Sequence, residues 1–143
     1  MNQYLETKWE VQNLETIKSF VEFQRYDNHS YMFAIIYSST NWHIGNIKIG
    51  PIHPHYKHAD ISYFIGEKAL WGKGCATEVI KLISQFGFED LHLHRIEAGV
   101  YDCAIGSQIA LEKNGFQREA VFRDSVIFNG QYIDTYRYAL VNY

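Results

Sequence analysis

A predicted strand, a glycine-rich turn and a predicted helix follow one another in the middle of the chain, and their order constrains the fold most. The stretch ADISYFIG (59–66) is rich in β-branched and aromatic residues, which favours a buried strand. After Gly72 and Gly74, apolar residues recur at helical spacing from Cys75 to Phe88. A further strand expected over 94–101 completes a crossover, which is typical of a sheet covered by helices.

The other elements follow from hydrophobic period and turn residues. Leu14, Ile17 and Phe20 recur at helical spacing and predict a first helix, whereas Asn129–Gly130 is a strong signal for a tight hairpin turn. We therefore expect, besides the elements above, a helix over 14–26, strands over 31–38 and 44–52, a short helix over 107–115 and a final hairpin over 116–143. The order predicts one mixed α/β domain that spans residues 1–143.

Composition places the chain among globular proteins and argues against several function classes. Apolar residues make up 47% and charged residues 20% of the 143 residues. The net charge of −3 and the scattered Lys and Arg argue against a nucleic-acid partner. Cys75 and Cys103 fit no CxxC pattern, and neither a signal peptide nor a long apolar run stands out, so we expect a cytoplasmic protein without a membrane partner. The histidines of HPHYKH (53–58) and HLH (92–94) lack companion cysteines, so we expect no metal.

The glycine turn before Cys75 has two interpretations. Backbone N–H groups converge at a helix N-terminus, where the helix dipole favours an anion, and glycines let a ligand approach the main chain. A tight turn with no ligand fits the residues equally well. The turn matches neither the P-loop nor the dinucleotide fingerprint. If the turn binds an anion, we expect the diphosphate of some other ligand.

A family resemblance bears on this choice. YFIGEKALWGKGCATEVIKL (63–82) and GSQIALEKNGFQREAVFRD (106–124) resemble the GNAT superfamily of acyl-CoA-dependent N-acyltransferases, and most of all its RimJ/RimL-type branch. The resemblance covers residues 31–141. It implies a central mixed, mostly antiparallel α/β sheet with two splayed strands and flanking helices. By the same resemblance, the chain would lack the family's first strand and helix.

The resemblance also implies which residues bind acetyl-CoA. The family's pyrophosphate signature, Gln/Arg-x-x-Gly-x-Gly/Ala, matches this chain at Gly74 and Ala76, with Trp71 in the first position. The residues implied for the pyrophosphate turn are Trp71, Gly72, Lys73, Gly74, Cys75 and Ala76. Those implied for the pantetheine arm, through strand-like backbone hydrogen bonds, are Phe64, Ile65 and Gly66. Ala104 replaces an asparagine that in the family bonds the same arm.

Transfer of an acyl group to an amine requires a deprotonated amine, so a general base is expected. Asp60 is the first candidate, because it falls where the superfamily's histone acetyltransferases carry a glutamate and because alternation places it on one face with Ser62 and Phe64. A plain surface aspartate is an equally good interpretation. Glu97 is the second candidate, although an ion pair with Arg95 or Lys48 is favoured for it.

The departing thiolate requires a proton donor. Ser107 matches the serine of the family's Asn-x-x-Ser motif, and the resemblance implies that it is this acid. Serine is also a preferred helix N-cap, so a capping role stays open. Many relatives place a tyrosine where this chain has Leu111. We do not expect Cys75 to form a covalent acyl-enzyme, and we interpret Cys103 as structural or incidental.

These inferences predict an acetyl-CoA-dependent N-acetyltransferase that acts on a primary amine. The acceptor is expected to be a small amine, such as a nucleotide-linked amino sugar, or a protein N-terminal amine. The alternative is a non-catalytic CoA-binding or protein-interaction module on the same fold. A homodimer is expected, because an exposed sheet edge is commonly paired or covered.

Overall fold

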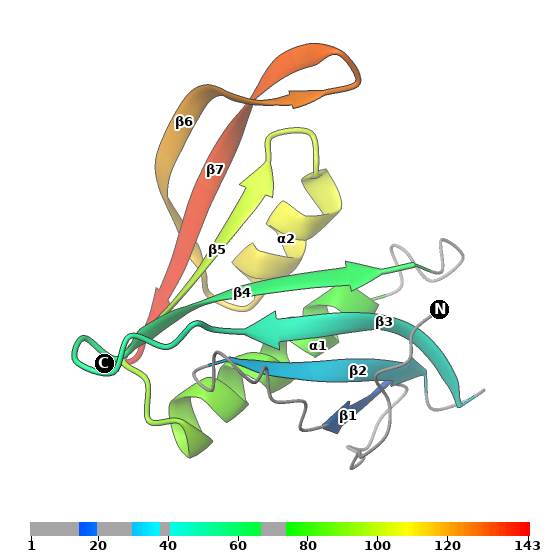
Figure 1. Cartoon of the computed structure of the whole chain (residues 1–143), viewed down its shortest axis with the longest axis vertical. Helices are drawn as coiled ribbons and strands as arrows, with labels where there is room; N and C mark the ends of the chain where they lie inside the picture. The colour runs from blue at the N-terminus through cyan, green and yellow to red at the C-terminus, as the bar shows by residue number, and fades with distance from the viewer. Residues whose placement is uncertain (1–14, 20–29, 38–40, 67–73) are drawn as a thin grey trace.

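One seven-stranded sheet organises the protein (Figure 1). The computed structural model describes residues 15–19, 30–37, 41–66 and 74–143. The strands run in the order β1-β2-β3-β4-β5-β7-β6 across the sheet. The elements are β1 (Glu15–Ser19), β2 (Tyr31–Tyr37), β3 (Trp42–Ile49), β4 (His58–Ile65), α1 (Cys75–Gln85), the π-helical turn η2 (Phe86–Asp90), β5 (Arg95–Tyr101), α2 (Ile105–Lys113), β6 (Gln117–Phe128) and β7 (Gln131–Val141).

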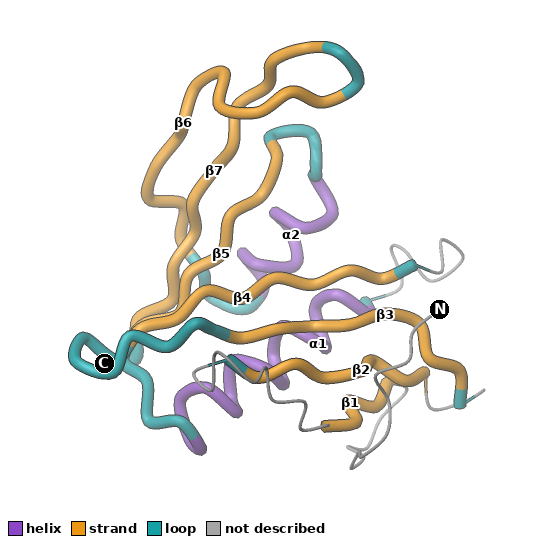
Figure 2. The backbone as a smooth tube through the Cα atoms, in the orientation of Figure 1, coloured by secondary structure: helices purple, strands orange, loops and turns teal. Residues whose placement is uncertain are grey.

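The sheet divides where β4 meets β5. This is its one parallel pairing in the described part of the chain, and it extends only from His58–Asp60 on β4 to Arg95–Glu97 on β5. Beyond it the two strands diverge, β4 with the β1–β3 half of the sheet and β5 with the β6–β7 hairpin (Figures 1 and 2). The predicted mixed, mostly antiparallel sheet with splayed strands is confirmed.

The helices cover one face of this sheet (Figure 1). Val79, Ile80 and Ile83 recur at helical spacing on α1 and are almost completely buried. They pack in one core with the inward residues of the strands and with Leu111 of α2. Full burial of one such side chain stabilises the fold by about 1.5–3 kcal/mol. The core thus fixes α1 and α2 against the same face of the splayed sheet.

Local signals predicted several elements correctly. The Asn129–Gly130 turn joins β6 to β7, and both residues adopt positive φ, 52° and 78°, as the tight hairpin turn requires. The first element differs from its prediction: residues 15–19 form β1 rather than part of a helix over 14–26, and β1 pairs antiparallel with β2. A strand there meets the unpaired backbone groups at the edge of β2, which the helical spacing of the apolar residues does not reveal.

Candidate active site in the splay

An open cavity of about 210 Å³ lies where β4 and β5 diverge. It is lined by residues of β4, β5 and α2 and of the loop before α2, among them Ile61, Tyr63, Ala98, Tyr101, Ala104 and Ser107. Two residues predicted from the sequence, Ala104 and Ser107, therefore lie together here. Tyr63, which the sequence analysis did not single out, lies with them.

The space between the diverging parts of β4 and β5 is called the splay here. Alternate residues of β4 turn their backbone groups toward it. The N–H of Gly66 donates to the carbonyl of Ile44 at 2.8 Å, and that of Gly50 donates to the carbonyl of Asp60, also at 2.8 Å. The register between these two bonds is unbroken. Because an antiparallel strand bonds its partner through alternate residues, even-numbered residues of β4 bond β3. Odd-numbered residues, including Ile65, turn their N–H and C=O groups toward the splay.

This alternation distinguishes the three residues predicted for the pantetheine arm. The N–H of Gly66 is already used by β3, so it cannot donate to a ligand in the splay. Phe64 pairs with Asn46 on β3, and its side chain is 64% exposed. Among the three predicted residues, Ile65 is the one whose backbone N–H and C=O groups are directed away from β3.

The helix side of the splay holds a pair of hydroxyl groups. Tyr63 donates its phenolic O–H to Ser107 Oγ at 2.8 Å, which joins β4 to α2. Burial raises the pKa of Tyr63, although the hydrogen bond with Ser107 lowers it in part. Ser107 is not the N-cap, because α2 begins after Ala104, so the capping interpretation is wrong. Ser107 instead lies in the cavity lining.

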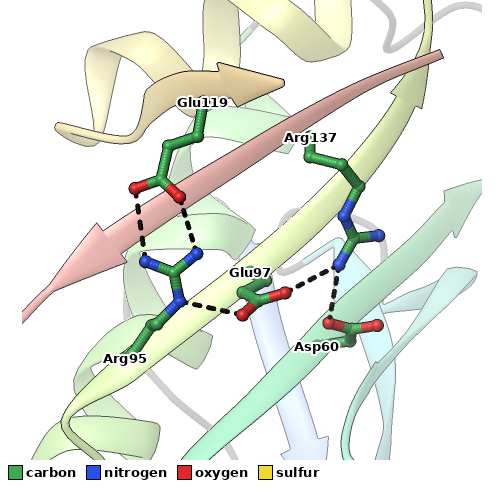
Figure 3. A network of polar contacts seen from close by, with 5 residues as sticks. All are labelled: Asp60, Arg95, Glu97, Glu119 and Arg137. Carbon is green, nitrogen blue, oxygen red and sulfur yellow. Dashed lines mark hydrogen bonds and ion pairs between the residues drawn. The ribbon is translucent and has the colours of Figure 1, made fainter. Parts of the chain in front are cut away.

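The face of the sheet that the helices do not cover is called the open face here. On it, five charged side chains form a chain of contacts next to the paired part of β4 and β5 (Figure 3). Arg137 Nη2 donates to Asp60 Oδ1 at 3.1 Å and to Glu97 Oε1 at 2.9 Å. Arg95 Nε donates to Glu97 Oε2 at 2.8 Å, and its two terminal nitrogens donate to Glu119 at 2.7 and 3.2 Å. Charges of alternating sign therefore link β4, β5, β6 and β7.

Strand register and one glycine bring these charges together. Asp60 lies opposite Glu97 in the last paired position of β4 and β5, and Gly99 lies opposite Arg137. A Cβ on Gly99 would lie 2.8 Å from Arg137 Nη1. The missing side chain thus lets the guanidinium cross β5 and reach β4. Sequence reasoning missed Arg137, because the contact joins residues 77 positions apart.

The two carboxylates proposed as bases have different surroundings. Burial raises the pKa of Glu97, but hydrogen bonds from Arg95 and Arg137 outweigh it and hold the pKa below its usual value. The favoured ion pair of Glu97 with Arg95 is present, although within one strand. The Asp60 side chain is 52% exposed against 23% for Glu97, and one arginine contacts it. Asp60, Ser62 and Phe64 share the exposed face, as alternation predicted.

α1 begins at a glycine with a left-handed backbone conformation. Gly74 is the N-cap with a φ of 86°, and no side chain caps the helix. A Cβ on Gly74 would meet no atom within 4 Å. Cys75 is 5% exposed, and its side chain packs in the core. Trp71, Gly72 and Lys73 lie outside the described residues.

The described part of the chain contains neither a metal-binding cluster nor a membrane-spanning helix. Among those residues, no three His, Cys, Asp or Glu side chains are arranged to hold a metal ion. No helix among them is long and apolar enough to cross a membrane. Cys103 is exposed and forms no disulfide.

The sequence also matches a known family. Residues 1–117 fit the family model described as the acetyltransferase (GNAT) domain. The chain belongs to this family. The match covers most of the chain, including the splay, the glycine turn and α2. The resemblance inferred from residues 63–82 and 106–124 is therefore confirmed.

Curated GNAT relatives extend this match. The chain is 38% identical over 116 residues to a probable N-acetyltransferase, YjcK, of Bacillus subtilis (strain 168), which covers 80% of this chain and 64% of YjcK. It is 35% identical over 109 residues to the uncharacterized N-acetyltransferase p20 of Bacillus licheniformis, covering 76% and 61% of the two chains. The chain thus spans a little under two thirds of the length of these relatives.

Solved GNAT structures share the architecture. A spermidine N-acetyltransferase from Vibrio cholerae, solved in complex with CoA and spermine, superposes with a TM-score of 0.75 at 24% identity. The superposition covers 82% of this chain and 68% of that one. At this identity the likeness establishes the shared fold.

Proposed function

We propose that this protein is an acetyl-CoA-dependent N-acetyltransferase that transfers an acetyl group to a primary amine. One observation carries the proposal: the cavity where β4 and β5 diverge is lined by the hydrogen-bonded hydroxyls of Tyr63 and Ser107, and the carboxylate of Asp60 lies on β4 at the last paired position before the strands part. Membership of the GNAT family supports it. So do the N-acetyltransferase descriptions of the relatives.

The proposed acetyl-CoA site begins at α1. The turn Trp71–Ala76 would hold the pyrophosphate, and the open space beside Gly74 supports this placement. The pantetheine arm would then lie in the splay, alongside the odd-numbered residues of β4 whose backbone is directed away from β3. Ala104, at the start of α2, would contact the arm without a side-chain hydrogen bond. The similar Vibrio cholerae enzyme was solved in complex with CoA, which supports acetyl-CoA as the cosubstrate.

The proposed reaction places a base and an acid on opposite faces of the splay. Asp60 takes the proton of the acceptor ammonium, directly or through a water molecule. The free amine attacks the thioester carbonyl, the C–N bond forms, the nitrogen releases its surplus proton to solvent and the C–S bond breaks. Ser107 donates its proton to the departing thiolate and regains one from solvent. Asp60 suits the base better than Glu97, because two arginines hold Glu97 and its lowered pKa makes it a weak proton acceptor.

The acceptor is proposed to be a small amine, with a protein N-terminal amine as the other candidate. By strand alternation, Phe64 and Tyr101 lie on the same open face of the sheet as Asp60, with 64% and 42% of their surface accessible. Aromatic faces next to a carboxylate suit an acceptor that is cationic until it loses its proton. A nucleotide-linked amino sugar is one acceptor of this kind.

A thiol-release assay tests the proposal. Acetyl-CoA is offered with a panel of polyamines, amino sugars, nucleotide-linked amino sugars and peptides with free N-termini. We expect CoA release that depends on one class of amine, together with an acetylated product of matching mass. Binding of acetyl-CoA without release in every case would contradict the proposed enzyme and support a non-catalytic CoA-binding module.

We further propose that two copies of the chain associate through the β6–β7 hairpin. β6 is an outer strand of the sheet, and apolar side chains of the hairpin lie exposed, namely Val121, Phe122, Ile127, Phe128 and Tyr132. Such patches commonly mark interfaces. Sedimentation equilibrium at micromolar concentration should give twice the chain mass of 16.7 kDa. A mass of one chain would contradict the dimer.

A further inference from the structure

We infer that Tyr63 is a positioning residue that turns Ser107 into an effective proton donor for the departing thiolate. The inference rests on the proposed acetyl transfer and gives a role to a residue to which the sequence analysis assigned none. Tyr63 lies on β4 and Ser107 on α2, so their hydrogen bond spans the cavity wall between strand and helix.

The geometry leaves the proton of Ser107 available. The phenolic O–H of Tyr63 points at Ser107 Oγ, which accepts the hydrogen bond at 2.8 Å. The serine therefore does not donate to Tyr63, and its own O–H is directed elsewhere. Since both residues line the cavity, the proton can reach a sulfur atom bound there.

The same bond makes Ser107 a stronger acid. A serine hydroxyl donates a proton poorly, because the oxygen left behind carries a concentrated negative charge. A hydrogen-bond donor already aimed at that oxygen stabilises the charge as it develops, most of all at a partly buried site. Burial raises the pKa of Tyr63, so the phenol keeps its proton and remains a donor at neutral and mildly alkaline pH.

No other hydroxyl of the described cavity lining has an equivalent contact with Ser107. Ser62 lies on the exposed face of β4. The Tyr101 ring lies edge-on to Phe128 at 5.5 Å and is 42% exposed. Leu111 carries no polar atom. Tyr63 is thus the side chain placed to act on the serine.

Tyr138 provides a matched control. It donates its phenolic O–H to Glu112 Oε2 at 2.9 Å, so it too bonds a side chain of α2. Its burial likewise raises its pKa. Unlike Tyr63, it does not line the cavity. Loss of the Tyr138 hydroxyl therefore removes a strand-to-helix bond without touching Ser107.

The experiment compares Tyr63→Phe, Ser107→Ala, the double variant and Tyr138→Phe with the parent protein in the thiol-release assay. We expect Tyr63→Phe to lower kcat about tenfold with the KM for acetyl-CoA unchanged, the size of one hydrogen bond to a developing charge. Ser107→Ala should lower kcat further. The double variant should be no slower than Ser107→Ala, because Tyr63 acts through the serine. Tyr138→Phe should keep the parental kcat.

The possible results separate this inference from the proposed function. An active parent with an unchanged kcat in Tyr63→Phe, or additive losses in the double variant, would overturn the role of Tyr63 alone. An equal loss of kcat in Tyr138→Phe would also overturn it, because a merely structural role would then explain both. A parent that binds acetyl-CoA but releases no thiol would overturn the proposed function and the inference with it.

Discussion

The two faces of the splay differ in chemistry. On the helix face, Tyr63 and Ser107 form a partly buried pair of neutral hydroxyls beside an apolar core. On the open face, carboxylates and guanidinium groups meet near solvent at the point where β4 and β5 part. In the proposed reaction, the proton donor Ser107 and the proton acceptor Asp60 therefore lie on opposite faces of the sheet. A substrate bound between β4 and β5 would meet the acid from one face and the base from the other.

The largest expected effect comes from removing the base. Asp60→Asn keeps the shape of the side chain but cannot accept the ammonium proton. General-base assistance typically contributes about 10²–10⁴-fold, so kcat/KM should fall by that factor near pH 7. The loss should shrink toward pH 9–10, where more of the acceptor amine is already neutral.

The control for Asp60→Asn is Glu119→Gln. Glu119 belongs to the same chain of charges but contacts Arg95 at its far end. Its kcat/KM should match the parent across the pH range. A parental profile for Asp60→Asn would show that the open face does not supply the base.

The next effect concerns stability in acid and separates Glu97 from Asp60. The pKa of Glu97 is lowered in the folded protein, so its stabilising contribution is present above the unfolded value of about 4.3 and is lost as the pH falls through the folded pKa. Glu97→Gln should therefore destabilise the protein by about 1–2 kcal/mol at neutral pH and less below about pH 4. Urea unfolding at several pH values measures this.

Activity completes the comparison of the two carboxylates. Glu97→Gln should retain most of the parental kcat/KM at pH 7, because its carboxylate is occupied by two arginines. A loss as large as that of Asp60→Asn, with recovery at alkaline pH, would move the role of base to Glu97.

The smallest expected effect tests how Arg137 reaches β4. An alanine in place of an interior glycine is favourable by about 0.5–1 kcal/mol when space is free, as it is at Gly106 on α2. Gly99→Ala should lack this gain, because its Cβ would displace the Arg137 guanidinium. In an Arg137→Met background the gain should return. Equal stability changes at Gly99 in both backgrounds would contradict the proposed displacement.

Much of the fold was predictable because its signals are local. The Asn129–Gly130 turn, the strand ADISYFIG and the apolar spacing of α1 each specify one element within a few residues. The first element was wrong because apolar residues at helical spacing also occur in a short strand, and a sheet edge decides between them. The family motif singled out Ser107, which lies in the cavity lining. The alternative that Ser107 caps the helix was wrong, because α2 begins two residues earlier, at Ile105.

The partners of the site residues were not predictable from the sequence. The hydrogen bond from Tyr63 to Ser107 joins positions 44 residues apart, and Arg137 reaches Asp60 from a strand on the far side of β5. Both contacts depend on register and on the divergence of two strands. In ADISYFIG, alternation alone would have placed a tyrosine hydroxyl on the face opposite Asp60, and this was the available signal for Tyr63.

The central claim, that acetyl-CoA occupies the glycine turn and the splay, is tested most directly by ligand-induced stabilisation in two matched glycine variants. Gly74 and Gly130 both have positive φ, 86° and 78°, and a Cβ at either would meet no atom within 4 Å. Gly74→Val and Gly130→Val thus impose similar backbone strain, but only the first blocks the pyrophosphate. At 100 times Kd, acetyl-CoA should stabilise the parent and Gly130→Val by about 2.7 kcal/mol, and Gly74→Val hardly at all. Full stabilisation of Gly74→Val, or none in the parent, would contradict the account.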